Sequence, residues 1–169
     1  MQVVYKNDVI DVKKGTRVID LLEKEISKSK QTVIACRFNN EVKALNYQIN
    51  SNGTIELIDL TSKDGMRIYT RGLIYIIGKA FSETYKDALL TVNYQLSHAM
   101  FCEVDNMEVT EVMIEKVNEK VKEIVAKDLP IIRKSMKREE AIEFYEKEKT
   151  IKGKLQLDAE NDKDVLLYY

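Results

Sequence analysis

The stretch that decides the fold of the first part of the chain is GTRVIDLLEKEI, residues 15–26. Its apolar side chains recur with the spacing of a helix that buries one face, at Val18, Leu21, Leu22 and Ile26. The glycine and threonine that open the stretch mark where the helix begins. We therefore expect one amphipathic helix here, with its apolar face covered by the segments on either side.

Short strands are expected around this helix. Runs rich in Val, Ile, Thr and Tyr occupy residues 2–5, 9–12, 32–38 and 55–60. Turn residues separate them, with Lys6-Asn7-Asp8 between the first two and Asn39-Asn40 after the third. Two strands, a helix and then further strands is the element order of a β-grasp sheet, which covers one face of its helix.

A second part follows the polar stretch Ser62-Lys63-Asp64-Gly65, which is the expected boundary between domains at residues 1–61 and 62–169. Helices are expected over residues 71–84, from the N-cap Thr110 to before Pro130, and from the cap Ser135 to residue 147. Strands are expected at residues 89–95, 100–104, 155–157 and 165–168. The pattern predicts an α+β fold with long helices and an antiparallel sheet.

Composition excludes several classes of protein. The 169 residues carry 27 Lys and Arg against 28 Asp and Glu, so a formal net charge of −1 offers no global attraction to nucleic acid or an acidic membrane. No apolar run approaches the roughly 20 residues that span a bilayer, and the first residues lack the layout of a signal peptide. Two cysteines, Cys36 and Cys102, make no disulfide framework. We expect a cytoplasmic protein with no membrane partner.

Most catalytic motifs are missing. The six glycines form neither a phosphate-cradling loop followed by Lys and Ser or Thr nor a Gly-x-Ser-x-Gly turn. The single histidine, His98, falls in the loop between two expected strands, where it is either an exposed loop residue or a group that lines a cleft. Cys36 falls in an expected core strand and is interpreted as a small buried hydrophobe.

The chain resembles a known pair of domains over nearly its whole length. The first part is similar to a TGS domain, a ubiquitin-like β-grasp module, in GTR at 15–17, DLL at 20–22, CRFNNEV at 36–42 and TIELI at 54–58. The second part resembles the editing-type second domain of threonyl-tRNA synthetase, in AFSETYKDA at 80–88, MFCEV at 100–104, VKEIVAKDLPI at 121–131 and REEAIEFY at 138–145.

One departure from that family concerns its metal-type motif, a helix that carries His-x-x-x-His. Counted back from Tyr85-Lys86-Asp87, the two histidine positions hold Arg71 and Tyr75. Arginine stays protonated, and a neutral tyrosine is a poor metal ligand. The family's second motif, a Cys with a His three residues beyond it, would lie past Tyr169. The resemblance thus implies no catalytic residue, no metal site and a degenerate second domain that is truncated at its C-terminal end.

A TGS-like domain followed by a degenerate editing-type domain resembles the N-terminal part of bacterial nucleoside kinases of the uridine kinase type. In those proteins, TGS and degenerate synthetase-like domains precede a P-loop kinase domain. That resemblance implies a non-catalytic accessory or regulatory region of an ATP-dependent phosphotransferase. This region would need no cofactor and would contact the kinase domain, which would use ATP and Mg. The alternatives are an N-terminal tRNA-binding, editing-type fragment of a threonyl-tRNA synthetase, and a freestanding deacylase that holds both metal-type motifs.

The resemblance also implies a candidate ligand cleft made of Arg71, Tyr75, Tyr94, His98 and Cys102. The last three belong to the hairpin that resembles the cleft wall, and the guanidinium of Arg71 suits phosphate or carboxylate. Two interpretations stay open. Either Arg71 and Tyr75 only fill the space of a lost metal site, or the cleft keeps a nucleotide or RNA 3′-end ligand. Because the charge is balanced, tRNA binding is expected to be micromolar or weaker.

Overall fold

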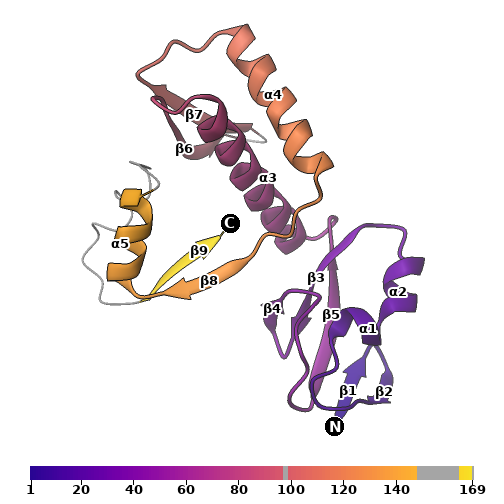
Figure 1. Cartoon of the computed structure of the whole chain (residues 1–169). Helices are drawn as coiled ribbons and strands as arrows, with labels where there is room; N and C mark the ends of the chain where they lie inside the picture. Colours follow the sequence, from indigo (N-terminus) through magenta and orange to yellow (C-terminus); the bar gives the residue numbers. More distant parts are fainter. Residues whose placement is uncertain (97–98, 148–163, 169) are drawn as a thin grey trace. The chain divides into compact units, whose positions relative to one another are not determined.

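The chain consists of two compact units, Met1–Tyr75 and Ile76–Tyr169, in a computed structural model that describes residues 1–96, 99–147 and 164–168. Figure 1 labels the elements in chain order. Each unit has its own buried cluster of apolar side chains. Both combine helices with antiparallel strand pairs, so the α+β class predicted from the sequence is confirmed.

A five-stranded sheet forms the first unit, with the order β2-β1-β5-β3-β4. Its strands are β1 (Gln2–Tyr5), β2 (Asp8–Asp11), β3 (Val33–Phe38), β4 (Glu41–Lys43) and β5 (Gly53–Asp59). The pair β1·β5 is parallel, and the other three pairs are antiparallel. Lys6, Asn39 and Asn40 have φ of 55°, 47° and 67° in the turns after β1 and β3. The predicted asparagine turn is therefore confirmed.

The stretch 15–26 is helical but bent. It forms α1 (Val18–Leu21) and α2 (Glu23–Lys28) on either side of Leu22, whose φ of −111° and ψ of 25° interrupt the helix. Val18 and Leu22 are nevertheless buried in one cluster with residues from the sheet, namely Val3, Cys36, Phe38 and Ile55. The predicted apolar stripe therefore packs against one sheet face, while the expectation of one unbroken helix was wrong.

The helix expected over residues 71–84 begins earlier, in the polar stretch after β5, as α3 (Lys63–Thr84). The Ser62 hydroxyl donates to the Asp59 carbonyl at 2.8 Å and accepts from the Gly65 amide at 3.0 Å, so it caps the helix. Arg37 on β3 donates to the Asp64 carboxylate at 2.6 Å. These contacts tie the first turn of α3 to the sheet. The domain boundary at 61/62 stays a prediction, since the compact units divide farther along, within α3.

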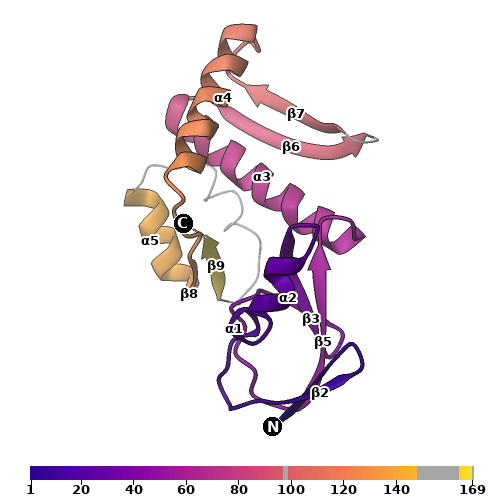
Figure 2. The ribbon, with the colours of Figure 1, turned by 90° about the vertical axis from the view of Figure 1, so that its right-hand side faces the viewer.

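In the second unit, two helices and a hairpin share one apolar cluster. The elements are the last turns of α3, the strands β6 (Leu89–Leu96) and β7 (Ala99–Asp105), and the helix α4 (Glu111–Ala126). The buried members of the cluster are Phe81, Ala88 and Met113. Thr110 caps α4 as predicted, because its hydroxyl accepts from the Met113 amide at 3.2 Å. Figure 2 shows α3 and α4 beside the β6–β7 hairpin.

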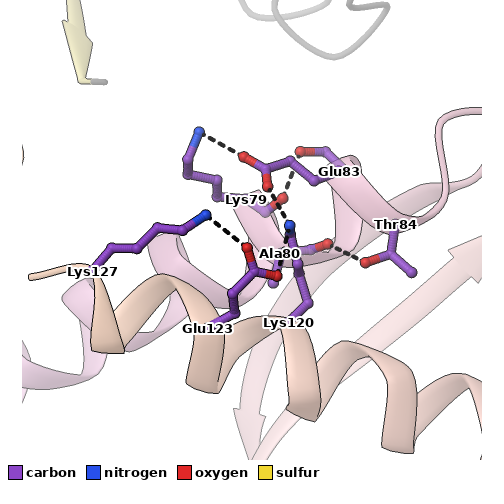
Figure 3. A network of polar contacts seen from close by, with 8 residues as sticks. Lys79, Ala80, Glu83, Thr84, Lys120, Glu123 and Lys127 are labelled. Carbon is purple, nitrogen blue, oxygen red and sulfur yellow. Dashed lines mark hydrogen bonds and ion pairs between the residues drawn. The ribbon is translucent and has the colours of Figure 1, made fainter. Parts of the chain in front are cut away.

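A row of alternating charges joins α3 to α4 (Figure 3). Lys120 of α4 reaches Glu83 of α3 at 3.2 Å and Glu123 of its own helix at 3.0 Å. Lys79 approaches Glu83 at 3.0 Å, and Lys127 approaches Glu123 at 2.6 Å. The lysine hydrogen bonds hold the pKa of both glutamates below the ordinary value, led by Lys79 for Glu83 and by Lys127 for Glu123. The network supplements the apolar contact between the helices.

The remaining described elements are β8 (Arg133–Met136), α5 (Arg138–Lys147) and β9 (Val165–Tyr168). Ser135 was expected to cap a helix, but it lies in β8 opposite Leu166 of the antiparallel partner β9. The helix α5 begins three residues later. The strand expected at residues 155–157 lies outside the described residues. Within the described ranges, no helix is both long and apolar enough to cross a bilayer.

Candidate functional site

Arg71 and Tyr75 lie on consecutive turns of α3, as the i, i+4 spacing requires. Arg71 is exposed and Tyr75 is half-buried. Both belong to the first compact unit, and the division between the units follows directly after Tyr75. The side chains that the candidate cleft takes from the hairpin, Tyr94 and Cys102, belong to the second unit.

The hairpin carries a stacked aromatic pair. Tyr94 of β6 lies opposite Phe101 of β7, where the register shifts between Val92 and Tyr94. The ring centroids are 5.0 Å apart and the ring planes differ by 18°. The Tyr94 side chain is 55% exposed and that of Phe101 is 41% exposed. An exposed, nearly parallel pair of rings offers a flat surface on which a planar ligand such as a nucleobase can stack.

Phe101 was missed by the sequence analysis, which placed Cys102 beside Tyr94. Consecutive residues of a strand point to opposite faces, so Phe101 and Cys102 cannot both lie on the Tyr94 face. Cys102 instead pairs in register with Val92 and is exposed on the other face. The cross-strand register, which depends on the bulge beside Asn93, was the missing signal. His98 lies outside the described residues.

A metal centre has no support among the side chains that the structure describes. No group of three His, Cys, Asp or Glu residues lies close enough there to hold an ion. Cys36 is buried in the first unit, and Cys102 lies in the second. At the two positions that the resemblance assigns to histidines, Arg71 and Tyr75 supply a permanent cation and a phenol. Neither group fits a divalent metal, so no hydrolytic step is derived through one.

A shallow hollow of about 460 Å³ lies on the first unit, a feature that the sequence analysis did not predict. Two cations line it, and both have partners. The Lys6 ammonium lies 5.2 Å from the centroid of the Tyr5 ring. The Arg37 guanidinium donates to Glu56 at 2.5 Å and to Asp64 at 2.6 Å, and these carboxylates raise the pKa of Arg37. The hollow therefore presents the paired charge of Arg37 and the Lys6 ammonium beside a neutral ring.

Comparison with known proteins finds relatives, although no family model matches the chain. It is 30% identical over 162 residues to the threonine–tRNA ligase of Clostridium kluyveri, which covers 94% of this chain and 25% of the relative. Threonine–tRNA ligase 1 of Bacillus subtilis is 30% identical over 129 residues, which is 76% of this chain and 20% of the relative. The Aquifex aeolicus threonine–tRNA ligase is 28% identical over 162 residues, 94% of this chain and 24% of the relative.

These relatives correct the main functional expectation from the sequence. The chain was interpreted as an accessory region of a uridine kinase-like nucleoside kinase, but its relatives are threonine–tRNA ligases. The interpretation was wrong because it treated Arg71 and Tyr75 as signs of a different lineage. A substitution at a site residue indicates a change in chemistry. Similarity over the whole chain is what indicates common descent. The expectation of ATP and Mg concerned the kinase domain rather than these residues, and it stays a prediction. The chain spans about a quarter of the length of these relatives, and over nearly its whole length it is related to threonyl-tRNA synthetases.

Proposed function

We propose that this chain is a tRNA-binding region of the kind found at the N-terminal end of threonyl-tRNA synthetases, with an editing-type site that binds without hydrolysing. The observation that carries the proposal is the similarity to threonine–tRNA ligases over 94% of the chain. A relation of that extent includes both compact units, so both share in the proposed role.

The first unit supports this proposal as a β-grasp domain of the TGS type. Its sheet order is β2-β1-β5-β3-β4, with β1 parallel to β5. The helices α1 and α2 lie in the chain between β2 and β3, and the buried side chains of Val18 and Leu22 join the core on one sheet face. This is the element order and the one-sided packing expected from the sequence for a β-grasp sheet.

The second unit supports binding through its hairpin. RNA-binding proteins hold unpaired bases by stacking them on aromatic side chains. Tyr94 and Phe101 present such rings, already stacked on each other and exposed. We infer that they receive an unpaired base of the tRNA. A stacked base contributes about 1–3 kcal/mol to binding by alanine substitution, which suits the weak affinity that the balanced net charge predicts.

Binding without hydrolysis follows from the helix that carries Arg71 and Tyr75. A catalytic zinc site needs three protein ligands and an open position for water. A cation near the Arg71 guanidinium would instead be repelled, by about 4 kcal/mol at 4 Å per unit charge for an effective dielectric near 20. The arginine attracts phosphate and carboxylate groups, so the position is suited to holding an anionic ligand.

The test measures binding and hydrolysis on the same protein. We expect a labelled threonine-accepting tRNA to bind with micromolar or weaker affinity, and mischarged tRNA to be deacylated no faster than in buffer. The double substitution Tyr94→Leu/Phe101→Leu keeps apolar surface but removes both rings, so it should weaken binding by about tenfold, equal to one stacked base of 1.4 kcal/mol. Leu96→Ala on the same exposed hairpin is the control and should bind like the parent.

Two results would overturn the proposal. The absence of any tRNA binding would remove its main claim. Deacylation above background would instead favour the freestanding deacylase, and metal analysis of the same sample would then be expected to find a bound ion.

A further inference from the structure

The helix α3 presents a ridge of basic side chains, of which the proposed function uses only Arg71. Every fourth residue along its first turns is basic and exposed: Lys63, Arg67 and Arg71. Residues four apart form a continuous ridge on a helix surface. The Arg67 side chain is 71% exposed. Within the described part of the chain, no ion pair of Lys63 or Arg71 occurs.

The ridge carries more positive charge than its one acidic neighbour, Asp64, offsets. Between residues 65 and 78, α3 contains Arg67 and Arg71 and no carboxylate, in a chain whose net charge is −1. The nearest acid along the helix is Asp64, which accepts from Arg37 at 2.6 Å. Its other oxygen is 3.8 Å from Arg67, beyond hydrogen-bonding distance. The donors of Arg67 and Arg71 therefore remain available to a ligand.

The spacing of the ridge suits a chain of phosphates. With a rise of about 1.5 Å per residue, successive basic side chains are displaced by about 6 Å along the helix axis. This displacement is of the same order as the separation of neighbouring phosphates along a nucleic-acid strand. Arginine binds phosphate with two parallel N–H donors, and two of the three ridge residues are arginines.

We propose that Lys63, Arg67 and Arg71 bind consecutive backbone phosphates of the tRNA. The inference rests on the proposed tRNA binding and adds to it a second contact, which recognises the phosphate backbone rather than a base. It also gives Arg71 a role of its own: at a position where the related family is expected to hold a metal ligand, this chain places a phosphate ligand.

Salt dependence tests the ridge directly, because each phosphate contact releases counterions. The affinity of the full 169-residue chain for threonine-accepting tRNA is measured by fluorescence anisotropy at several KCl concentrations. For Arg67→Gln/Arg71→Gln, the slope of log K against log[salt] should become shallower by about 1.4–1.8. Two phosphate contacts are lost, and each contributes about 0.7 to 0.9 to the slope. At 0.1 M salt the affinity should fall by about 25- to 60-fold, if each contact contributes only its counterion release.

The matched control is Lys116→Gln/Lys122→Gln, which removes two exposed charges from α4. This control should leave the slope of log K against log[salt] unchanged. The variant Arg67→Lys/Arg71→Lys should retain most of the parent's slope, because the positive charges remain. Circular dichroism verifies that each variant keeps its helix content. If the parent binds but the ridge and control variants have the same slope, the ridge assignment is wrong while tRNA binding stands. If the parent does not bind at all, the proposed function fails and this inference falls with it.

Discussion

The two thiols of the chain differ in surroundings and should differ in reactivity. Cys36 is fully buried, with its Sγ 3.6 Å from the Lys43 carbonyl and 3.8 Å from that of Ala44. Burial raises the pKa of this thiol and so lowers its thiolate fraction, and the thiolate is the reactive form. Cys102 is exposed. We expect a maleimide to label Cys102 in the native protein, and both cysteines in urea, as counted by mass spectrometry.

The variant Cys102→Ser provides the control for that experiment and should remain unlabelled until it is denatured. Rapid labelling of Cys36 in native Cys102→Ser would contradict the buried core described here. The burial of Cys36 was predicted from its place in an apolar strand and is confirmed. The Tyr94–Phe101 stack was not predicted, because a bulge changes which side chains share a face and local sequence does not reveal it.

At the scale of elements, the glycines of α3 should respond to substitution with opposite signs. A Cβ on Gly65 would lie 1.8 Å from the Asp59 carbonyl oxygen, so the backbone would have to move. Overpacking of this kind costs about 1–3 kcal/mol. A Cβ on Gly72 would meet nothing within 4 Å. Gly72→Ala should therefore raise the free energy of unfolding by about 0.8–1 kcal/mol, the helix-propensity difference.

Urea denaturation of Gly65→Ala and Gly72→Ala measures both effects on one helix. If both substitutions stabilise the protein, then the first turn of α3 does not pack against the end of β5 as described. If neither changes the stability, then α3 is not helical through Gly72.

The network of ion pairs on α3 and α4 should make stability depend on pH. The pKa values of Glu83 and Glu123 are lowered by their lysine partners, so both carboxylates are charged in the folded state above the ordinary glutamate pKa. A depressed pKa gives stability that is present at neutral pH and is lost as the pH falls through the lowered value. Lys120→Gln removes the lysine that bridges both glutamates. The loss of unfolding free energy between pH 6 and 3 should therefore be smaller in this variant.

Lys116→Gln is the control for the pH experiment, since Lys116 lies exposed on the same helix. Its pH dependence should match that of the parent. A parent and a Lys120→Gln variant with the same acid dependence would mean that the bridge is absent in solution. High salt should also reduce the difference, because exposed charges are screened.

Local sequence patterns predicted the positions of some helices, strands and turns correctly and misplaced others. The asparagine turn, the Thr110 cap and the strand at residues 165–168 were predicted and are confirmed. The start of α3 was misplaced because Ser62, Asp64 and Gly65 are typical of loops, yet here Ser62 caps the helix and Gly65 permits close packing. Ser135 was misplaced because its strand partner lies about 30 residues away in sequence.

At the scale of the whole molecule, fold class and lineage were easier to predict than activity. The α+β class and the synthetase-like resemblance rested on many residues, and the relatives support them. The kinase expectation rested on a few site features, chiefly Arg71 and Tyr75, and was wrong. Site residues change with function more readily than the rest of a chain, so a few of them identify chemistry but not ancestry.

The last prediction concerns where the first unit ends. The sequence favours a boundary after residue 61, but three contacts join the residues just beyond it to the sheet: the Ser62 cap, the close packing of Gly65 on Asp59, and the Arg37–Asp64 ion pair. A fragment of residues 1–61 loses all three, whereas a fragment of residues 1–75 keeps them. We therefore expect the longer fragment to unfold at higher urea concentration. In the longer fragment, Asp64→Asn should remove part of the gain in the urea midpoint of unfolding. Arg67→Gln leaves the Arg37–Asp64 pair intact and should not change this midpoint. Equal unfolding midpoints for the two fragments would place the boundary at residue 61 and assign the whole of α3 to the second domain.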